Sequence, residues 1–236
     1  MTGRPQKTWR AGFATDLGHY SVGYGVGRIV SEWLLMSLVN SSRIGLDVCP
    51  IAFQVILALL VSDLMYYLLH RLMHQTPWLW QFHMVHHSSV ELDWLATVRI
   101  HPLEQILIKI SQMAPLYLLG FPPAVLAIFM LCSAGMAFWI HANVPWRFPI
   151  LRWLIVTPEY HHWHHHYQPK EQHKNFAVLF PLWDLLGGTL SLPEGDMPFQ
   201  YGSDLPVPLG YWQQFIFPFR RIYRMYWTVS PTADKL

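Results

Sequence analysis

The sequence predicts an all-α integral membrane protein, a bundle of transmembrane helices with a histidine-rich cap that faces the cytosol and holds a di-metal site. Of the 236 residues, 53% are hydrophobic and only 13% are charged, and a soluble domain carries about twice that share of charge. Aromatic residues make up 15%, as is typical of rings that anchor helix ends at a bilayer. Clusters of histidine lie at the edges of the apolar stretches.

We expect one domain over residues 1–236, with its motifs at about 50–190 and a water-facing tail over 191–236. The net charge of +2, with dispersed basic residues, favours a phospholipid surface over a nucleic-acid partner. Cys49 and Cys132 lie in apolar stretches and are expected to be small buried residues, neither a disulfide nor an iron–sulfur site. The basic N-terminus runs into polar, glycine-rich sequence, unlike a removable signal peptide.

The clearest predicted span covers residues 50–69, about the twenty apolar residues that a bilayer requires, and runs directly into HRLMH. Before it, residues 26–39 are apolar apart from Arg28 and Glu32, which predicts an interfacial or tilted helix. After Thr76 and Pro77, a further helix carries WLWQFHMVHH.

Two more apolar segments, 103–119 and 124–141, are separated by GFPP and predict a helical hairpin, with the depth of its first arm left open. Such a hairpin returns the chain to the face where the span over 50–69 ends. All the histidine clusters then meet at that face. We expect this face to be cytosolic, because basic residues lie near it: Arg147, Arg152, Lys170 and Lys174.

Eight histidines form three clusters: His70 and His74; His83, His86 and His87; His161, His164 and His165. Residues three and four apart share a helix face, so each cluster can direct its rings toward one point. Imidazole is a frequent ligand of transition metals, and a tetrahedral zinc ion takes only about four ligands. The spacing therefore predicts a two-metal centre.

Ligand type alone does not distinguish iron, zinc, copper and nickel. Zinc hydrolases with an HExxH helix use a glutamate as general base, and Arg71 occupies that position here. No serine or cysteine lies in a nucleophile motif. A redox centre beside an apolar, water-excluding cavity is therefore favoured.

Several motifs occur in a specific order between Asp63 and Thr189: DLMYYLLHRLMH, WQFHMVHHS, RIHPLE, HANVPW, TPEYHHWHH and NFAVLFPLWDLLGGT. This succession resembles the fatty acid hydroxylase and sterol desaturase superfamily of membrane di-iron oxygenases. The resemblance implies two irons that activate O2 to hydroxylate or desaturate a lipid C–H bond. It implies the eight clustered histidines as iron ligands, and His141 of HANVP as a ninth.

The chain departs from that family pattern at two positions, Ala177 and Gly187, where many members have glycine and phenylalanine. These departures bear on substrate fit. Many members also carry a span before residue 50, which the polar N-terminus here does not supply. We therefore expect a short member, or a chain that begins late.

Four residues are candidates for orienting the ligand imidazoles. Asp63, seven residues before His70, is expected to accept a hydrogen bond from a ligand N–H, with helix packing as its alternative. His101 either serves the metal site or substrate pocket or only packs. Asn175 and Asp184 either orient imidazoles or cap turns.

His162 points away from the helix face of its cluster and is expected not to be a ligand, whereas the role of His166 is left open. No catalytic acid or base beyond the metal ligands is required for the first step. The chain shows no CxxCH haem attachment, no flavin or nicotinamide motif and no cysteine quartet. Electrons are therefore expected from an external donor, a cytochrome b5-like protein, a ferredoxin or a rubredoxin.

The sequence thus favours a lipid hydroxylase over a desaturase. Two other classes remain: a histidine-rich membrane protein that binds or transports metal, and a zinc-dependent lipid hydrolase. An ion relay predicts polar residues along several helices, whereas the polar ligands here gather at one end. Metal analysis distinguishes the oxygenase from the hydrolase, because about two irons per chain support an oxygenase and native zinc supports hydrolysis.

Overall fold

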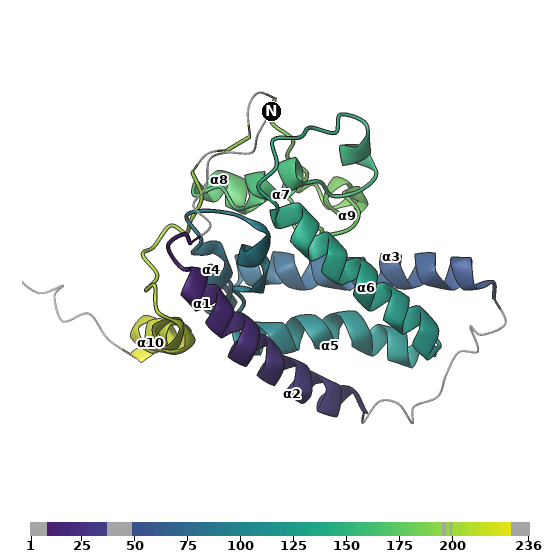
Figure 1. Cartoon of the computed structure of the whole chain (residues 1–236), viewed down its shortest axis with the longest axis horizontal. Helices are drawn as coiled ribbons and strands as arrows, with labels where there is room; N and C mark the ends of the chain where they lie inside the picture. The colour runs from purple at the N-terminus through teal and green to yellow at the C-terminus, as the bar shows by residue number, and fades with distance from the viewer. Residues whose placement is uncertain (1–8, 37–48, 195–196, 199, 228–236) are drawn as a thin grey trace, which may run out of the picture.

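The regular structure is helical throughout the described residues, which are 9–36, 49–194, 197–198 and 200–227, and no strand occurs among them (Figure 1). We obtained this view from a computed structural model of the chain. In chain order the elements are α1 (Phe13–Gly18), the π-helix η1 (His19–Tyr24), α2 (Gly25–Met36), α3 (Ile51–Gln75), α4 (Pro77–His87), the 3-10 helix η3 (Trp94–Val98), α5 (Pro102–Leu118), α6 (Pro123–His141), the 3-10 helix η4 (Leu151–Trp153), α7 (Pro158–His164), α8 (Pro169–Gln172), α9 (Leu182–Leu186) and α10 (Tyr211–Trp227).

Two helices, α3 and α6, are long and apolar enough to cross a membrane. At 1.5 Å per residue they measure about 37 and 28 Å, against a hydrocarbon core of about 30 Å. Most of each apolar window is exposed, with only 28% of α3 and 22% of α6 buried. That exposure distinguishes them from core helices of a soluble domain. The predicted helix over 26–39 is present as α2 up to Met36, and residues 37–39 lie outside the described part.

The predicted hairpin is formed by α5 and α6, which are joined at Gly120 with a φ of 78°. Helix α5 lies between α2 and α3 (Figure 1). Buried apolar side chains of α3, α5 and α6, such as Ala58, Leu116 and Phe129, form a shared core. This packing places the end of α3 and the end of α6 on the same side of the molecule, beside α7 and α9 (Figure 1).

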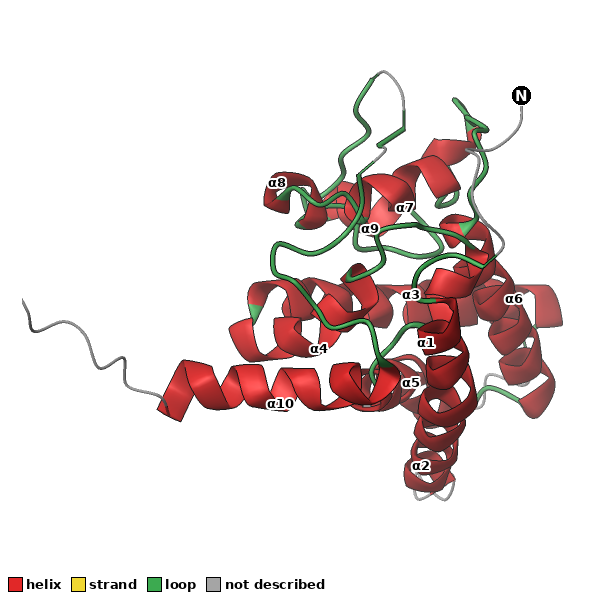
Figure 2. Ribbon diagram, turned by 60° about the vertical axis from the view of Figure 1, so that its left-hand side comes forward, coloured by secondary structure: helices red, strands yellow, loops and turns green. Residues whose placement is uncertain are grey.

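The tail after residue 190, which was predicted to face water, contains the 17-residue helix α10. One face of α10 packs beneath α4, where the rings of Phe82 and Phe219 lie 5.5 Å apart (Figure 2). Large apolar side chains of α10 are exposed, among them Trp212 and Tyr223. The sequence analysis missed this amphipathic helix because its arginines and glutamines lowered the average hydropathy of the segment.

The expectation that both cysteines are buried is also wrong. Cys132 is exposed on the outer face of α6, and Cys49 is half-buried just before α3. Apolar sequence around a cysteine does not bury it when the helix that carries it turns that face outward. The two cysteines are not joined by a disulfide.

Gly187 contacts the rest of the fold so closely that no side chain fits there. A Cβ at this position would lie 1.9 Å from the Tyr67 hydroxyl and 3.0 Å from the Arg71 guanidinium. We expect Gly187→Ala to lower the apparent melting temperature in detergent by roughly 2–12 °C, because overpacking typically costs about 1–3 kcal/mol. The matched control is Gly135→Ala on α6, whose added methyl meets no atom within 4 Å. Equal melting temperatures for the two variants would contradict this account.

Candidate metal centre

Nine buried histidines converge in two adjacent groups, and within each group the closest ring nitrogens lie within 4.8 Å of one another. The first group consists of His70, His74, His83, His87 and His164, and the second group of His86, His141, His161 and His165. These are the nine histidines singled out from the sequence. The groups lie side by side, because the rings of His87 and His165 are stacked with their centroids 4.5 Å apart.

Two of the three histidine clusters are divided between the two groups, although each cluster was predicted to direct its rings toward one point. At about 100° per residue, positions i and i+4 on a helix are about 40° apart, and position i+3 lies on the other side of i. On α4, His83 and His87 therefore enter the first group and His86 the second. Around α7 positions i and i+4 again stay together, but the groups are exchanged: His161 and His165 enter the second group and His164 enters the first.

Five of the nine imidazoles donate their Nδ1–H to a fixed acceptor. The carboxylate Oε1 of Glu104 accepts from His83 at 2.6 Å. Backbone carbonyls accept from the other four: Phe176 from His70 at 2.7 Å, Arg99 from His86 at 3.2 Å, Ala137 from His141 at 2.7 Å, and Lys174 from His164 at 2.7 Å. Because a neutral ring carries one proton, each of these rings presents a bare Nε2.

These bare nitrogens face one another. The Nε2 atoms of His70 and His83 are 2.9 Å apart, and those of His86 and His141 are 3.3 Å apart. Neither pair can form a hydrogen bond while both protons sit on Nδ1. Protonation is opposed by burial, which lowers the pKa of His83 to about 3 and that of His86 well below its usual value. A metal cation between the lone pairs resolves this conflict, so the residues present fit a metal.

The remaining rings support the same conclusion. Both nitrogens of His74 are buried without a partner, as is the Nδ1 of His87, His161 and His165. Burial and the neighbouring imidazoles also lower the pKa of His87, His161, His164 and His165 well below its usual value. A buried nitrogen without a hydrogen-bond partner destabilises the fold unless a ligand binds to it.

Glu104 is a residue of the metal centre that the sequence did not reveal. This residue is 1% exposed in the first turn of α5 and makes the 2.6 Å contact with His83. An acidic residue within RIHPLE, at the start of an otherwise apolar helix, was the available signal.

Asp63 was expected to bond to a ligand imidazole and instead bonds to the backbone, whereas His101 has the packing role that was one of its alternatives. Asp63 accepts hydrogen bonds from the backbone N–H groups of residues 178–180, at 2.8–3.1 Å. Seven residues along a helix amount to about 10 Å, which places Asp63 too far from the ring of His70. His101 instead begins α5, where its Nδ1 accepts from the Leu103 N–H, and its Nε2 lies 3.0 Å from the Phe215 carbonyl of α10.

Asn175 and Asp184 have the turn role that was their alternative. Asn175 adopts a φ of 59° and bonds to the backbone of Tyr160 and Ser191. Asp184 accepts from the backbone N–H groups of Phe176 and Ala177. Asp184 therefore fixes the peptide whose carbonyl holds His70.

His162 and His166 stay outside both groups. The Nδ1 of His162 lies 2.8 Å from the Tyr201 hydroxyl, in agreement with its expected exclusion from the ligands. His166, which the sequence left open, forms an isolated bridge with Tyr201 through its backbone.

A buried charge network fixes the carbonyl that holds His86. The guanidinium of Arg99 donates to Asp16 at 2.5 Å, and Asp16 also accepts from Arg10 at 2.6 Å. Arg10 continues the network to Asp93 at 2.6 Å. The segment before α2 is thereby attached to the metal centre, a connection that no local sequence pattern revealed.

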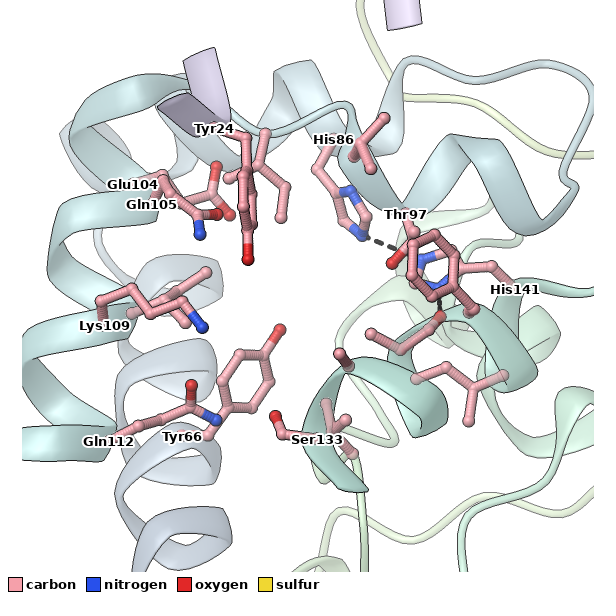
Figure 3. Close-up of a pocket in the computed structure, with 18 of the residues that line it drawn as sticks. Tyr24, Tyr66, His86, Thr97, Glu104, Gln105, Lys109, Gln112, Ser133 and His141 are labelled. Atoms are coloured by element: carbon pink, nitrogen blue, oxygen red, sulfur yellow. Dashed lines mark hydrogen bonds between the residues drawn. The ribbon is translucent and has the colours of Figure 1, made fainter. Parts of the chain in front are cut away.

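A cavity of about 270 Å³ opens beside the second group. His86, His141 and His161 form part of its wall, and the rest combines apolar side chains such as Val98, Ile108 and Phe138 with polar ones from α5 (Figure 3). Ala177 and Gly187, the departures linked above to substrate fit, do not line it. Their effect is instead on packing.

Comparison with known proteins gives one consistent family. The family model described as fatty acid hydroxylase matches residues 55–189. The chain is 35% identical over 178 residues to ornithine lipid hydroxylase OlsE of Rhizobium tropici, covering 74% of this chain and 53% of the relative. It is 32% identical over 181 residues to alkylglycerol monooxygenase of Danio rerio, covering 76% of this chain and 40% of the relative.

A third relative, very-long-chain aldehyde decarbonylase GL1-1 of Oryza sativa subsp. indica, is 28% identical over 162 residues, covering 64% of this chain and 26% of the relative. The chain thus spans about half or less of the length of these relatives. No solved protein structure matches it.

The contact between Glu104 and His83 predicts a measurable change in metal retention. We expect Glu104→Gln to weaken metal binding about 10–100-fold, because loss of a carboxylate partner lowers the basicity of a ligand imidazole. Metal content after dialysis against a graded series of chelator concentrations measures this, with circular dichroism as the check on folding. The exposed Glu194→Gln is the control. Equal retention in both variants would exclude this role.

Proposed function

Because the chain belongs to the fatty acid hydroxylase family, we propose that it is a membrane-bound, O2-dependent di-iron oxidoreductase that hydroxylates an alkyl C–H bond of a lipid. The observation that carries the proposal is the set of bare Nε2 atoms that face one another in two adjacent groups. The printed names of two relatives, a lipid hydroxylase and a monooxygenase, favour hydroxylation over desaturation.

The nine histidines would hold two ions, one in each group. Iron in both groups would supply the activation of O2 and the abstraction of hydrogen from an alkyl carbon. Glu104 and four carbonyls accept the Nδ1–H groups and so direct the bare Nε2 atoms toward the ions, while burial keeps the imidazoles neutral. No side-chain acid or base is needed for the first step.

The cavity beside the second group is the proposed substrate site. It reaches His86, His141 and His161, and apolar side chains of α5 and α6, such as Ile108 and Phe138, form another part of its lining. Such a lining suits an alkyl chain and limits access of water to the reacting carbon. The polar ligands lie at one end of α3 and α6 and not along them, which argues against an ion relay through the membrane.

We propose that α3 and α6 lie in the membrane and that the metal centre faces the cytosol, where an electron donor reaches it. Hydroxylation places one oxygen atom in the product and releases the other as water, so it consumes two electrons and two protons. A cytochrome b5-like protein, a ferredoxin or a rubredoxin would supply the electrons. Arg147, Arg152, Lys170 and Lys174 support this orientation, although Arg147 and Arg152 face the buried Glu159 at 3.9 and 3.5 Å.

The direct test compares lipid extracts by mass spectrometry from cells that express the wild type, His86→Ala or His166→Ala. We expect the wild type to produce a lipid species heavier by one oxygen atom, because His86 lines the cavity and belongs to the second group. His86→Ala should abolish that species, with membrane insertion unchanged, and His166→Ala should retain it. Retention of the product in His86→Ala would contradict the proposed site. A lipid species that is lighter by two hydrogens and gains no oxygen would show that the reaction is desaturation and not hydroxylation.

A further inference from the structure

One wall of the cavity is unexpectedly polar for a site that accepts an alkyl chain. Gln105, Lys109 and Gln112 lie at positions i, i+4 and i+7 of α5 and therefore share one helix face. The Lys109 ammonium points into the cavity, together with the hydroxyls of Tyr24 from η1 and Tyr66 from α3 (Figure 3). His86 and His141 lie across the cavity from this wall (Figure 3).

Lys109 has no compensating partner in the described part of the chain. Its side chain is half-buried, and it takes part in no hydrogen bond or ion pair with another described residue. The carboxylate of Glu32 acts on the Lys109 charge only from a distance and is paired with Arg28 at 2.7 Å. The carboxylate that lines the cavity, Glu104, contacts His83. Lys109 is the one lysine or arginine among the described lining residues, and the lining histidines are neutral.

An unpaired ammonium beside apolar walls is costly, and amide N–H and phenol O–H groups add further donors around it. The cavity thus offers one positive charge and several hydrogen-bond donors to whatever occupies it. Ammonium groups bind carboxylates and phosphates as point charges, and neighbouring amides complete the coordination of their oxygens.

We propose that Lys109, with Gln105 and Gln112 beside it, binds an anionic oxygen group, a carboxylate or a phosphate, of the lipid substrate. The inference rests on the proposed function, because it takes the cavity as the substrate site. It names the substrate class as an anionic lipid and makes Lys109 a residue that determines specificity.

The geometry also limits where the lipid is oxidised. Lys109 follows Glu104 by five residues, about 7.5 Å along α5, and the Glu104 carboxylate contacts a histidine of the metal centre. A lipid held at Lys109 therefore extends toward His86 and His141, which lie across the cavity of about 270 Å³.

The test measures binding of three probes that share an alkyl chain: palmitate, hexadecyl phosphate and uncharged hexadecan-1-ol. The metal-loaded full-length protein is titrated with each probe in neutral detergent without reductant, and bound lipid is counted by native mass spectrometry. We expect Lys109→Met to weaken binding of the preferred anionic probe about 10–100-fold and to leave hexadecan-1-ol binding unchanged. Lys109→Arg should restore most of the affinity, and the exposed Lys170→Met is the matched control.

The outcomes are distinct. Preference of the wild type for palmitate or for hexadecyl phosphate, lost in Lys109→Met, supports the site and identifies which anion it accepts. Unchanged anion binding in Lys109→Met, an equal loss of hexadecan-1-ol binding, or a wild type that does not favour either anion overturns it. These results do not depend on turnover. If Lys109-dependent binding is found but cells contain no oxygenated lipid, the hydroxylase proposal fails and the anion site stands.

Discussion

The structure depends on the hydrogen bond that each of five imidazoles donates from Nδ1 to a fixed acceptor. That bond leaves Nε2 without a proton, and the fold then brings such nitrogens to about 3 Å from one another. Burial prevents the repulsion from being relieved by protonation. The protein therefore holds together an arrangement that only a metal cation makes favourable, and the surrounding helices must resist its collapse.

The supporting contacts explain how this resistance is built. Asp63 of α3 and Asp184 of α9 take up the backbone N–H groups of residues 176–180, so the carbonyl that holds His70 cannot shift freely. Asp16 instead binds the guanidinium of Arg99, the residue whose carbonyl holds His86. In both cases a buried carboxylate fixes the residue or peptide whose carbonyl orients a ring. The cavity then adjoins the second group, so chemistry at the metals and recognition on α5 share one wall.

The sequence was sufficient to predict the apolar helices and the eight clustered histidines, because hydropathy gives the apolar spans and the i, i+3, i+4 spacing gives shared faces. His141 followed only from the family resemblance. It was insufficient for contacts between distant segments. The partition of His83, His86 and His87 between the groups depends on which helices lie on each side of α4. The contact of Glu104 with His83 and the role of Asp63 depend on tertiary packing, and helix α10 was hidden by its mixed composition.

The account is tested most directly by locating the metals themselves. Anomalous diffraction at the iron edge, from crystals of the full-length protein grown under iron-replete conditions, measures their positions independently of activity. We predict two iron peaks, one enclosed by His70, His74, His83, His87 and His164, and one enclosed by His86, His141, His161 and His165. A single peak shared by both groups, or peaks at the zinc edge in place of iron, would contradict the di-iron centre.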